Sequence, residues 1–307
     1  MRRFSFLFAA LAVVAAFEPA GAETPEAAVK LIILGTGTPN ADPDRSGPAL
    51  AIIVDDQAFL FDAGPGVVRR AAAAARKGEK ALEAEKLDTA FLTHLHSDHT
   101  LGLPDLIFSP WVLERQKPLD LYGPPGTAAM ARNIEKAWSA DRHLRLSGLE
   151  PANPTGWKVE THEIKKPGAV YEKGGVSIEA FPVKHGSWKY AYGYKLSAHG
   201  KTIVISGDAT PSPALIDAAK DADILIHEVY SEEGFNKRPP EWRRYHKAFH
   251  TSTRELAEIA NETQPKRLIL YHQLYWGYTD DDLVREIREA GYEGATNSAR
   301  DLDIYVP

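Results

Sequence analysis

The residues best suited to chemistry in this sequence lie in one short stretch, His94-Leu95-His96-Ser97-Asp98-His99, which follows an apolar run. His94 and His96 are two residues apart and share a face if the chain is extended. Asp98 and His99 follow where the chain turns and therefore point to a neighbouring position. Imidazole and carboxylate without thiolate are ligands for zinc or a similar divalent ion. The spacing predicts two adjacent metal ions, whereas a single histidine in a polar loop would predict none.

Several later apolar runs end in residues of the same types. These residues are His185 after the run 176–183, Asp208 after 201–206, His227 and Glu228 in the run from 224, and His272 in the run from 268. Open α/β sheets collect functional groups at their strand ends. One such histidine is usually structural, but a repeated set beside a histidine-rich stretch favours a metal site.

The elements that must position these residues alternate along the chain. Apolar runs predict strands at 29–34, 49–54, 58–61, 89–92, 119–122, 159–164, 176–183, 191–196 and 201–206, and helices are predicted at 67–77, 105–113, 127–141 and 253–262. The stretch 234–247 is expected to be a long polar loop. Gly35 and Gly37 precede loop residues rather than a helix, which argues against a dinucleotide site. No repeat or Gly/Ser-rich linker divides the chain, so residues 23–307 are predicted to form a single α/β domain.

Composition restricts the function classes. The net charge of −6 argues against broad nonspecific binding of nucleic acid, which depends on neutralising phosphates. There is no cysteine, so the chain forms no disulfide and offers no thiolate ligand.

Residues 1–22 have the pattern of a secretory signal peptide. Arg2 and Arg3 precede a largely apolar run, 4–17, and Ala20-Gly21-Ala22 supplies the small residues of a cleavage site. A buried N-terminal helix or a membrane anchor is the alternative, but the run is short for a membrane span. We therefore expect an exported protein, periplasmic or secreted, without a stable membrane anchor.

Taken together, these motifs resemble those of the metallo-β-lactamase superfamily, in the branch that contains ribonuclease Z and arylsulfatase-like enzymes. The matching pieces are Gly35-Thr36-Gly37, Phe61-Asp62-Ala63-Gly64, the 94–99 stretch with Gly102-Leu103-Pro104, His185, Gly207-Asp208, His227-Glu228, His250-Thr251-Ser252-Thr253 and His272. The resemblance covers nearly all of the chain after residue 22. It implies a four-layer αβ/βα sandwich and a metal-dependent hydrolase.

The resemblance also implies a ligand set. The first zinc ion would take His94, His96 and His185, the second would take Asp98, His99 and His272, and Asp208 would bridge both. Histidine at position 96, where diiron relatives usually carry glutamate, favours two zinc ions per chain, although other divalent ions are possible. Such a pair makes a bridging hydroxide available near neutral pH. We expect it to cleave a phosphodiester or an aryl sulfate ester of a small anionic substrate.

Further residues are assigned supporting roles. By resemblance His250 is a proton donor or phosphate contact, and Asp98 is counted with it as catalytic. The alternative is that His250 merely precedes a helix capped by Thr251 or Ser252. Three other residues are expected to orient the ligands through hydrogen bonds: Asp62, His227 and Glu228. Asp62 could instead cap the following helix.

Two features of the sequence bear on the kind of substrate: a locally basic stretch and one departure from the family pattern. Arg238 and Arg243 could hold an anionic group and Trp242 could stack on a ring, or all three could be solvated. Ribonuclease Z usually carries a long tRNA-gripping arm between the positions of His185 and Asp208, and this chain has only a hairpin's length there. Nucleic acid is therefore not expected as a partner.

The resemblance also bears on antibiotic hydrolysis. The true β-lactamases of this superfamily usually carry a residue other than aspartate at the position of Asp208, which argues against that activity. Lactam, lactone or thioester hydrolysis, noncatalytic metal binding and a homodimer stay open.

Overall fold

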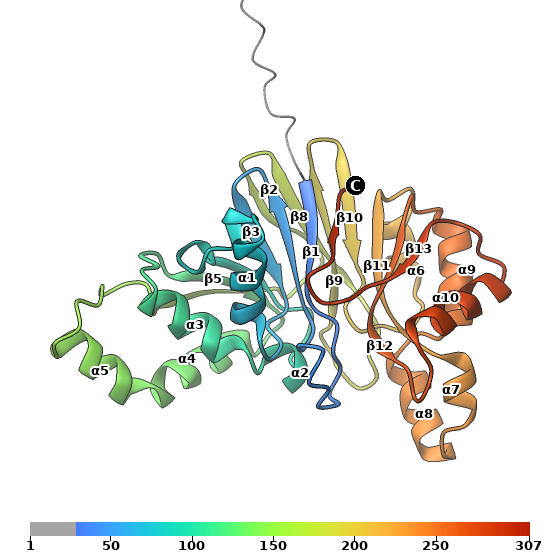
Figure 1. The fold of residues 1–307 in the computed structure, drawn as a ribbon, viewed down its shortest axis with the longest axis horizontal. Coiled ribbons are helices and arrows are strands. Elements are labelled where there is room, and N and C mark those ends of the chain that lie inside the picture. Colours follow the sequence, from blue (N-terminus) through green and yellow to red (C-terminus); the bar gives the residue numbers. More distant parts are fainter. Residues whose placement is uncertain (1–28) are drawn as a thin grey trace, which may run out of the picture.

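A computed structural model describes residues 29–307, so the signal peptide predicted for residues 1–22 lies outside the described residues. Two seven-stranded sheets pack face to face, and helices cover the outer face of each sheet (Figure 1). Within the described part, no helix has the length and apolar character needed to cross a membrane.

The first sheet has parallel and antiparallel strands. Its order is β14 (Ile304–Tyr305), β1 (Val29–Gly35), β2 (Ala49–Val54), β3 (Gln57–Phe61), β4 (Thr89–Phe91), β5 (Leu119–Gly123) and β6 (Val159–Glu163). Strands β1 to β3 pair antiparallel, and β3 to β6 pair parallel. The carboxyl ends of β3 and β4, from which Asp62 and His94 follow, therefore lie at the same edge.

The second sheet is also mixed. Its order is β13 (Thr296–Ser298), β12 (Leu268–Leu274), β11 (Ile224–Tyr230), β10 (Lys201–Ile205), β9 (Tyr192–Ala198), β8 (Val176–Pro182) and β7 (Gly168–Lys173). Strands β10 to β13 are parallel, so the residues that follow β10 and those near the ends of β11 and β12 reach one edge together.

The helices divide between the two sheets. Helices α1 (Val67–Arg76) and α3 (Leu103–Val112) pack on the first sheet, and α6 (Pro213–Ala219), α9 (Thr253–Thr263) and α10 (Asp280–Glu289) pack on the second. Helices α4 (Thr127–Ala137) and α5 (Ser139–Ser147) extend from one side, at the left in Figure 1. The short α2 (Ser97–Thr100), α7 (Glu232–Asn236) and α8 (Pro240–Phe249) lie toward the lower end of that view. Single 3-10 turns form at Lys80–Leu82 and Ala84–Lys86.

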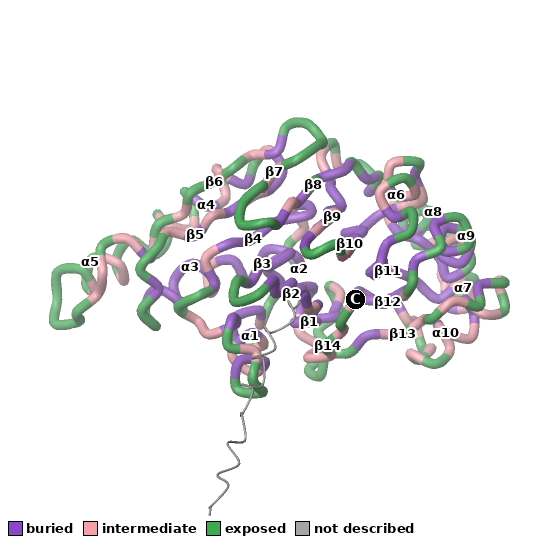
Figure 2. Tube along the Cα trace, turned by 90° about the horizontal axis from the view of Figure 1, so that it is seen from above, coloured by how far each residue is buried: buried purple, intermediate pink, exposed green. Residues whose placement is uncertain are grey.

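Strand alternation sorts the apolar side chains into three layers. Along β1, Leu31 and Ile33 enter the layer between the sheets, whereas Ile32 and Leu34 enter the layer beneath α1 and α3. A third layer lies between the second sheet and α6, α9 and α10. The buried strands and the more exposed outer helices are visible in Figure 2. Burying each such side chain contributes about 1.5–3 kcal/mol. This arrangement confirms the predicted four-layer sandwich.

Two predicted elements were wrong. Residues 234–247 are not a long loop, because α7 and α8 occupy most of them. Ser231 caps α7 by accepting a hydrogen bond from the Gly234 N–H, and Pro240 occupies the first turn of α8. Proline suits a first helical turn, where its missing N–H costs nothing. The single helix predicted at 127–141 is two helices, which meet at Trp138.

Candidate metal centre

Seven predicted ligands come from five chain segments and converge at one end of the sandwich. His94 and His96 follow β4, Asp98 and His99 lie in α2, His185 follows β8, Asp208 follows β10, and His272 lies within β12. Gly207 allows the turn before Asp208: its φ is 61°, and a Cβ there would lie 2.9 Å from the Tyr192 carbonyl oxygen. All of these side chains are buried except that of His96, which is half-buried.

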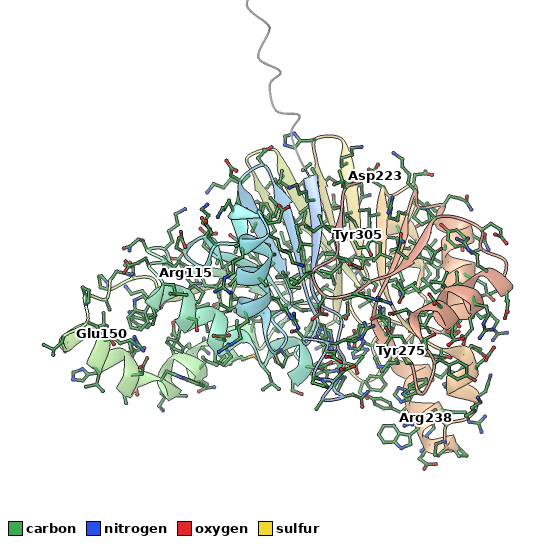
Figure 3. The ribbon with its side chains drawn as sticks, in the orientation of Figure 1. Arg115, Glu150, Asp223, Arg238, Tyr275 and Tyr305 are labelled. Atoms are coloured by element: carbon green, nitrogen blue, oxygen red, sulfur yellow. The ribbon has the colours of Figure 1, made fainter. Side chains whose placement is uncertain are left out.

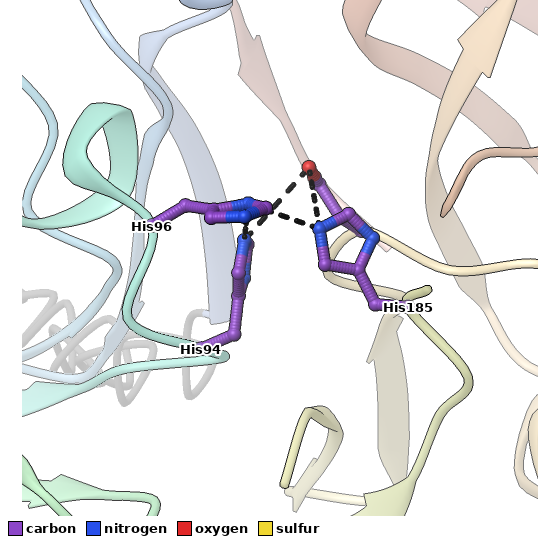
Figure 4. Close-up of side chains that lie close together, drawn as sticks. His94, His96 and His185 are labelled. Carbon is purple, nitrogen blue, oxygen red and sulfur yellow. Dashed lines mark hydrogen bonds and ion pairs between the residues drawn. The ribbon is translucent and has the colours of Figure 1, made fainter. Parts of the chain in front are cut away.

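The first group comprises three histidines and Asp208. Nδ1 of His96 lies 3.0 Å from Nε2 of His94 and 3.1 Å from Nε2 of His185. Figure 4 shows these three rings pointing toward one another. One ligand atom from each of the four residues lies within 4.8 Å of the others. Nitrogen atoms this close, with a carboxylate beside them, match the converging ligand set of a tetrahedral ion.

The second group comprises Asp98, His99 and His272, whose ligand atoms also lie within 4.8 Å of one another. Oδ2 of Asp98 is 3.5 Å from Nε2 of His99 and 3.2 Å from Nε2 of His272. His272 adopts a left-handed backbone conformation, with φ 46°. Such strain in a residue other than glycine is concentrated at functional sites.

Asp208 lies between the two groups. Its Oδ1 is 3.4 Å from Nε2 of His99, and its Oδ2 is 3.9 Å from Nε2 of His185 and 3.6 Å from Nε2 of His272. One carboxylate therefore faces ligands of both groups, which is the geometry of a bridging ligand.

The residues fit a pair of divalent ions. Nε2 of His99 and Oδ1 of Asp208 are buried and have no hydrogen-bond partner among the described residues. Burial lowers the pKa of His185 to about 4, and burial together with the neighbouring His99 lowers the pKa of His94 well below its ordinary value. Both rings are therefore neutral at pH 7, the form that binds metal. The fit supports a dinuclear site, while zinc as the ion and the individual ligand assignments stay predictions.

Hydrogen bonds fix the tautomers of two candidate ligands. Nδ1 of His99 donates to Oδ2 of Asp62 at 2.8 Å, and Nδ1 of His185 donates to the carbonyl of Phe249 at 2.7 Å. Both bonds leave Nε2 free to bind a metal. Asp62 directly follows β3, is buried and has φ 60°, and it does not cap α1, whose N-cap is Gly66.

His250 lies beside the two groups and faces a buried glutamate. Its Nδ1 is 3.4 Å from Oε2 of Glu228 and 3.9 Å from Oδ2 of Asp208. Oε1 of Glu228 accepts a hydrogen bond from the backbone N–H of Thr251 at 2.9 Å. Ser252 caps α9 in a reciprocal capping box. Ser252 thus caps α9, as the alternative interpretation predicted, and His250 lies at the end of α8 and faces the site.

His227 is placed away from the candidate ligands. It is fully buried, its Nδ1 donates to the Glu228 carbonyl at 2.6 Å, and within residues 29–307 its Nε2 has no hydrogen-bond partner. It makes no hydrogen bond to a candidate ligand in that range. The role predicted for His227 in orienting a ligand therefore has no contact to support it.

A cavity of about 420 Å³ opens beside the metal centre. It is lined by Pro39, Asn40, His96, Asp98, Asp208, Arg238, Trp242, Tyr245, His246, His250, His272, Leu274 and Trp276. Arg238 and Trp242 thus lie where substrate contacts were predicted, whereas Arg243 is not among the lining residues. His246 lines the cavity although the sequence motifs do not point to it. Its position one helical turn before His250 would have been the signal, had the helix been recognised.

The two mixed sheets, the outer helices and the buried His/Asp site define a hydrolase of the metallo-β-lactamase fold. A family profile described as a beta-lactamase superfamily domain matches residues 57–273. The chain belongs to the metallo-β-lactamase superfamily and is related to ribonuclease Z.

Ribonuclease Z of Mycobacterium bovis is 33% identical over 278 residues, which cover 89% of this chain and 96% of the relative. Ribonuclease Z of Mycobacterium tuberculosis is 31% identical over the same lengths. Two solved structures show the same fold. The metallo-beta-lactamase fold protein YhfI from Bacillus subtilis has a TM-score of 0.69 and 19% identity, covering 91% of this chain and 100% of that one. Human tRNase Z, short form, has a TM-score of 0.67 and 20% identity, covering 91% and 99%.

Proposed function

We propose that this protein is a dinuclear zinc hydrolase that cleaves a phosphodiester bond in a small anionic substrate. The observation that carries the proposal is the position of Asp208, whose carboxylate faces candidate ligands of both groups. Two bound ions would lower the pKa of water and so supply hydroxide at neutral pH. The chain's own residues would hold the ions, admit the ester and manage the proton of the leaving group.

His250 is the residue that we assign to the leaving group. It lines the cavity, and Glu228 lies 3.4 Å from its Nδ1. The carboxyl group of Glu228 lies beside Nδ1 but forms no hydrogen bond with it. In its place at the cavity wall, the imidazole would deliver a proton to the departing oxygen. Asp98 lines the same cavity and lies 3.2 Å from His272. There it would orient the ester as well as hold a metal.

Phosphodiester chemistry is favoured by the relatives, and a small substrate is favoured by the site. The curated relatives described above are ribonucleases, enzymes that cleave phosphodiester bonds. Between His185 and Asp208, however, the chain contains only strands β9 and β10 and their connections. The cavity beside the ligands has the size of a small molecule, about 420 Å³. Nucleic acid is therefore not part of the proposal.

An aryl sulfate ester is the second candidate. Trp242, Tyr245 and Trp276 line the cavity and could pack against the ring of such a substrate. The charge distribution of a sulfate ester resembles that of a phosphodiester at the reacting centre, so the same ligand set would serve either substrate.

Turnover tests the proposal. The chain from Glu23 onward is reconstituted with zinc and assayed on bis-4-nitrophenyl phosphate, 4-nitrophenyl sulfate and a chromogenic cephalosporin. The Asp208→Asn variant is compared with Asp55→Asn, which alters an exposed aspartate paired with His199. We expect phosphodiester turnover that only Asp208→Asn abolishes. Sulfate turnover alone would favour the second candidate. Rapid cephalosporin hydrolysis, or metal binding without turnover, would reject the proposed activity.

Export is a separate part of the proposal and depends on the pattern of residues 1–22 alone. Expression of the full chain followed by fractionation and N-terminal sequencing tests it. A mature chain that begins at Glu23 outside the cytoplasm is the expected result, and an uncleaved chain inside would contradict it.

A further inference from the structure

One wall of the cavity is built around an arginine. Arg238 follows α7, and its guanidinium carbon lies 5.6 Å from the ring centroid of Trp242 and 5.4 Å from that of Trp276. Arg238 is labelled near α7 and α8 in Figure 3. Two indole rings thus contact the cation, which fixes its position without using its hydrogen-bond donors.

The guanidinium of Arg238 is unpaired among residues 29–307. It forms no ion pair with a carboxylate and no side-chain hydrogen bond there, and its Nε is buried without a partner. The adjacent Lys237, by contrast, donates to the hydroxyl of Tyr278. Buried donors in folded proteins are nearly always satisfied, so an arginine left open in a cavity has the features of a ligand contact.

His246 repeats this pattern beside Arg238. It is only 7% exposed and is the one buried residue of α8, a position that an amphipathic helix normally fills with an apolar side chain. Its ring lies 5.7 Å from the ring of Trp242 and 4.5 Å from that of Trp276. Neither ring nitrogen has a hydrogen-bond partner among the described residues. The imidazole can therefore add a hydrogen bond to a group held by Arg238.

The same cavity reaches the candidate metal ligands. Asp98, Asp208 and His272 line it together with Arg238 and His246. Its volume of about 420 Å³ exceeds what the reacting ester group alone would fill, so the cavity has room for a part of the substrate that lies away from the metals. Trp242 and Tyr245 are 46% and 38% exposed, and they leave aromatic surface open to that part.

From these contacts we infer that Arg238, His246, Trp242 and Trp276 form a recognition subsite for an oxyanion carried on a planar, non-reacting group of the substrate. The inference rests on the proposed hydrolytic function of the metal centre. It narrows the substrate class from any small phosphodiester to an aromatic diester with a second negative group, such as a carboxylate. The planar fork of an arginine matches two oxygens of such a group.

Two matched diesters test the inference. The first is 4-nitrophenyl 4-carboxyphenyl phosphate, and the second is the same diester with a carboxamide in place of the carboxylate. We expect the wild-type protein to prefer the carboxylate in kcat/KM by about tenfold to a hundredfold, the range for a charge-assisted hydrogen bond. Arg238→Gln should remove this preference. Lys247→Gln, which removes one positive charge from an exposed position of the neighbouring helix α8, should retain it.

Binding gives a readout that does not depend on turnover. Tryptophan fluorescence is titrated with 4-carboxyphenyl phosphate and 4-carbamoylphenyl phosphate in the wild type, Arg238→Gln and Lys247→Gln. Tighter binding of the carboxylate probe, lost only in Arg238→Gln, would support the subsite. If neither diester were cleaved in that case, only the proposed hydrolytic function would be rejected. Equal binding of both probes by the wild type, or a preference that survives in Arg238→Gln, would overturn the subsite. Thermal melting of each variant verifies that it is folded.

Discussion

The carboxylate of Asp62 and the imidazole of His99 are joined by a hydrogen bond of 2.8 Å between Oδ2 and Nδ1. Oδ1 of Asp62 also accepts a hydrogen bond from the backbone N–H of Thr93 at 2.8 Å. One side chain therefore ties the end of β3 to the segment after β4 and sets the orientation of a candidate ligand. Such contacts raise the basicity of the ligand and hold its ring in place.

Replacing Asp62 should weaken metal binding. We expect Asp62→Asn to lower zinc affinity by about 10- to 100-fold, because the amide no longer fixes the Nδ1–H tautomer of His99. Competition with a chromophoric chelator measures the affinity of both sites. Asp55→Asn serves as the matched control, since Asp55 is exposed and its carboxylate pairs with His199, away from the candidate ligands. Unchanged affinity in Asp62→Asn would show that His99 does not need this contact.

Replacing His250 should slow the reaction and leave the metals bound. We expect His250→Ala to lower kcat by about 10²–10⁴ on a diester with a poor leaving group, which needs a proton, and by far less on a 4-nitrophenyl ester. Steady-state kinetics with the two leaving groups, together with zinc analysis, test this. His250 also lies within ligand distance of Asp208 and His272. A loss of zinc from the variant would therefore identify it as a ligand instead.

Arg115 should be essential for stability. It is 1% exposed, and its guanidinium donates to four backbone carbonyls, those of Leu87, Leu106, Ile107 and Gly156. Burial lowers its pKa to about 10, so it stays charged at neutral pH. Arg115→Ala leaves these carbonyls unsatisfied and should lower the free energy of unfolding by more than about 3 kcal/mol.

Urea denaturation at equilibrium measures the effect of Arg115→Ala. Arg132→Ala, at an exposed position of α4, is the control and should change stability by less than about 0.5 kcal/mol. Arg115→Lys should also be destabilising, because one ammonium group cannot reach all four carbonyls. Near-native stability of both Arg115 variants would show that the hydrogen bonds from Arg115 to the four carbonyls are not needed for stability.

Asp280 should make stability depend on pH in the acid range. Burial acts to raise its pKa, but hydrogen bonds from Tyr275 and Ser298 and the charge of Arg45 outweigh burial and lower the pKa below its ordinary value. A carboxyl group whose pKa is lower in the folded state than in the unfolded state stabilises the protein fully at pH values above its unfolded-state pKa. This contribution is lost as the pH falls through its folded-state pKa. Asp280→Asn should therefore cost about 1–3 kcal/mol at pH 7 and progressively less below about pH 4.

Unfolding of Asp280→Asn is compared with the wild type at pH 7, 5 and 3.5. Asp281→Asn, at an exposed neighbouring position of α10, is the control and should show no such trend. A difference between Asp280→Asn and the wild type that stayed constant over this range would argue against the lowered pKa.

Strands were easier to predict than helices and edge elements in this chain. The runs that form β1, β2 and β10 are apolar on both faces because each lies between two apolar layers, and composition alone reveals them. The two-residue β14 and the three-residue β13 were missed, since so short a segment has no pattern of its own. Helix α8 was missed because its single buried residue is a histidine, which erases the apolar periodicity by which helices are recognised.

By itself, the sequence determined the types of the candidate ligands and their places at strand ends, because alternation and strand termination are local properties. His94, His96, Asp98 and His99 are close in the chain, so their meeting needed no knowledge of the fold. Only the tertiary structure decided that Asp208 faces both ligand groups and that Arg238 rather than Arg243 lines the cavity. Those relationships depend on how two sheets stack and how α8 docks on them. Packing between segments far apart in the chain sets the positions of Asp208 and Arg238, and no local sequence pattern encodes that packing.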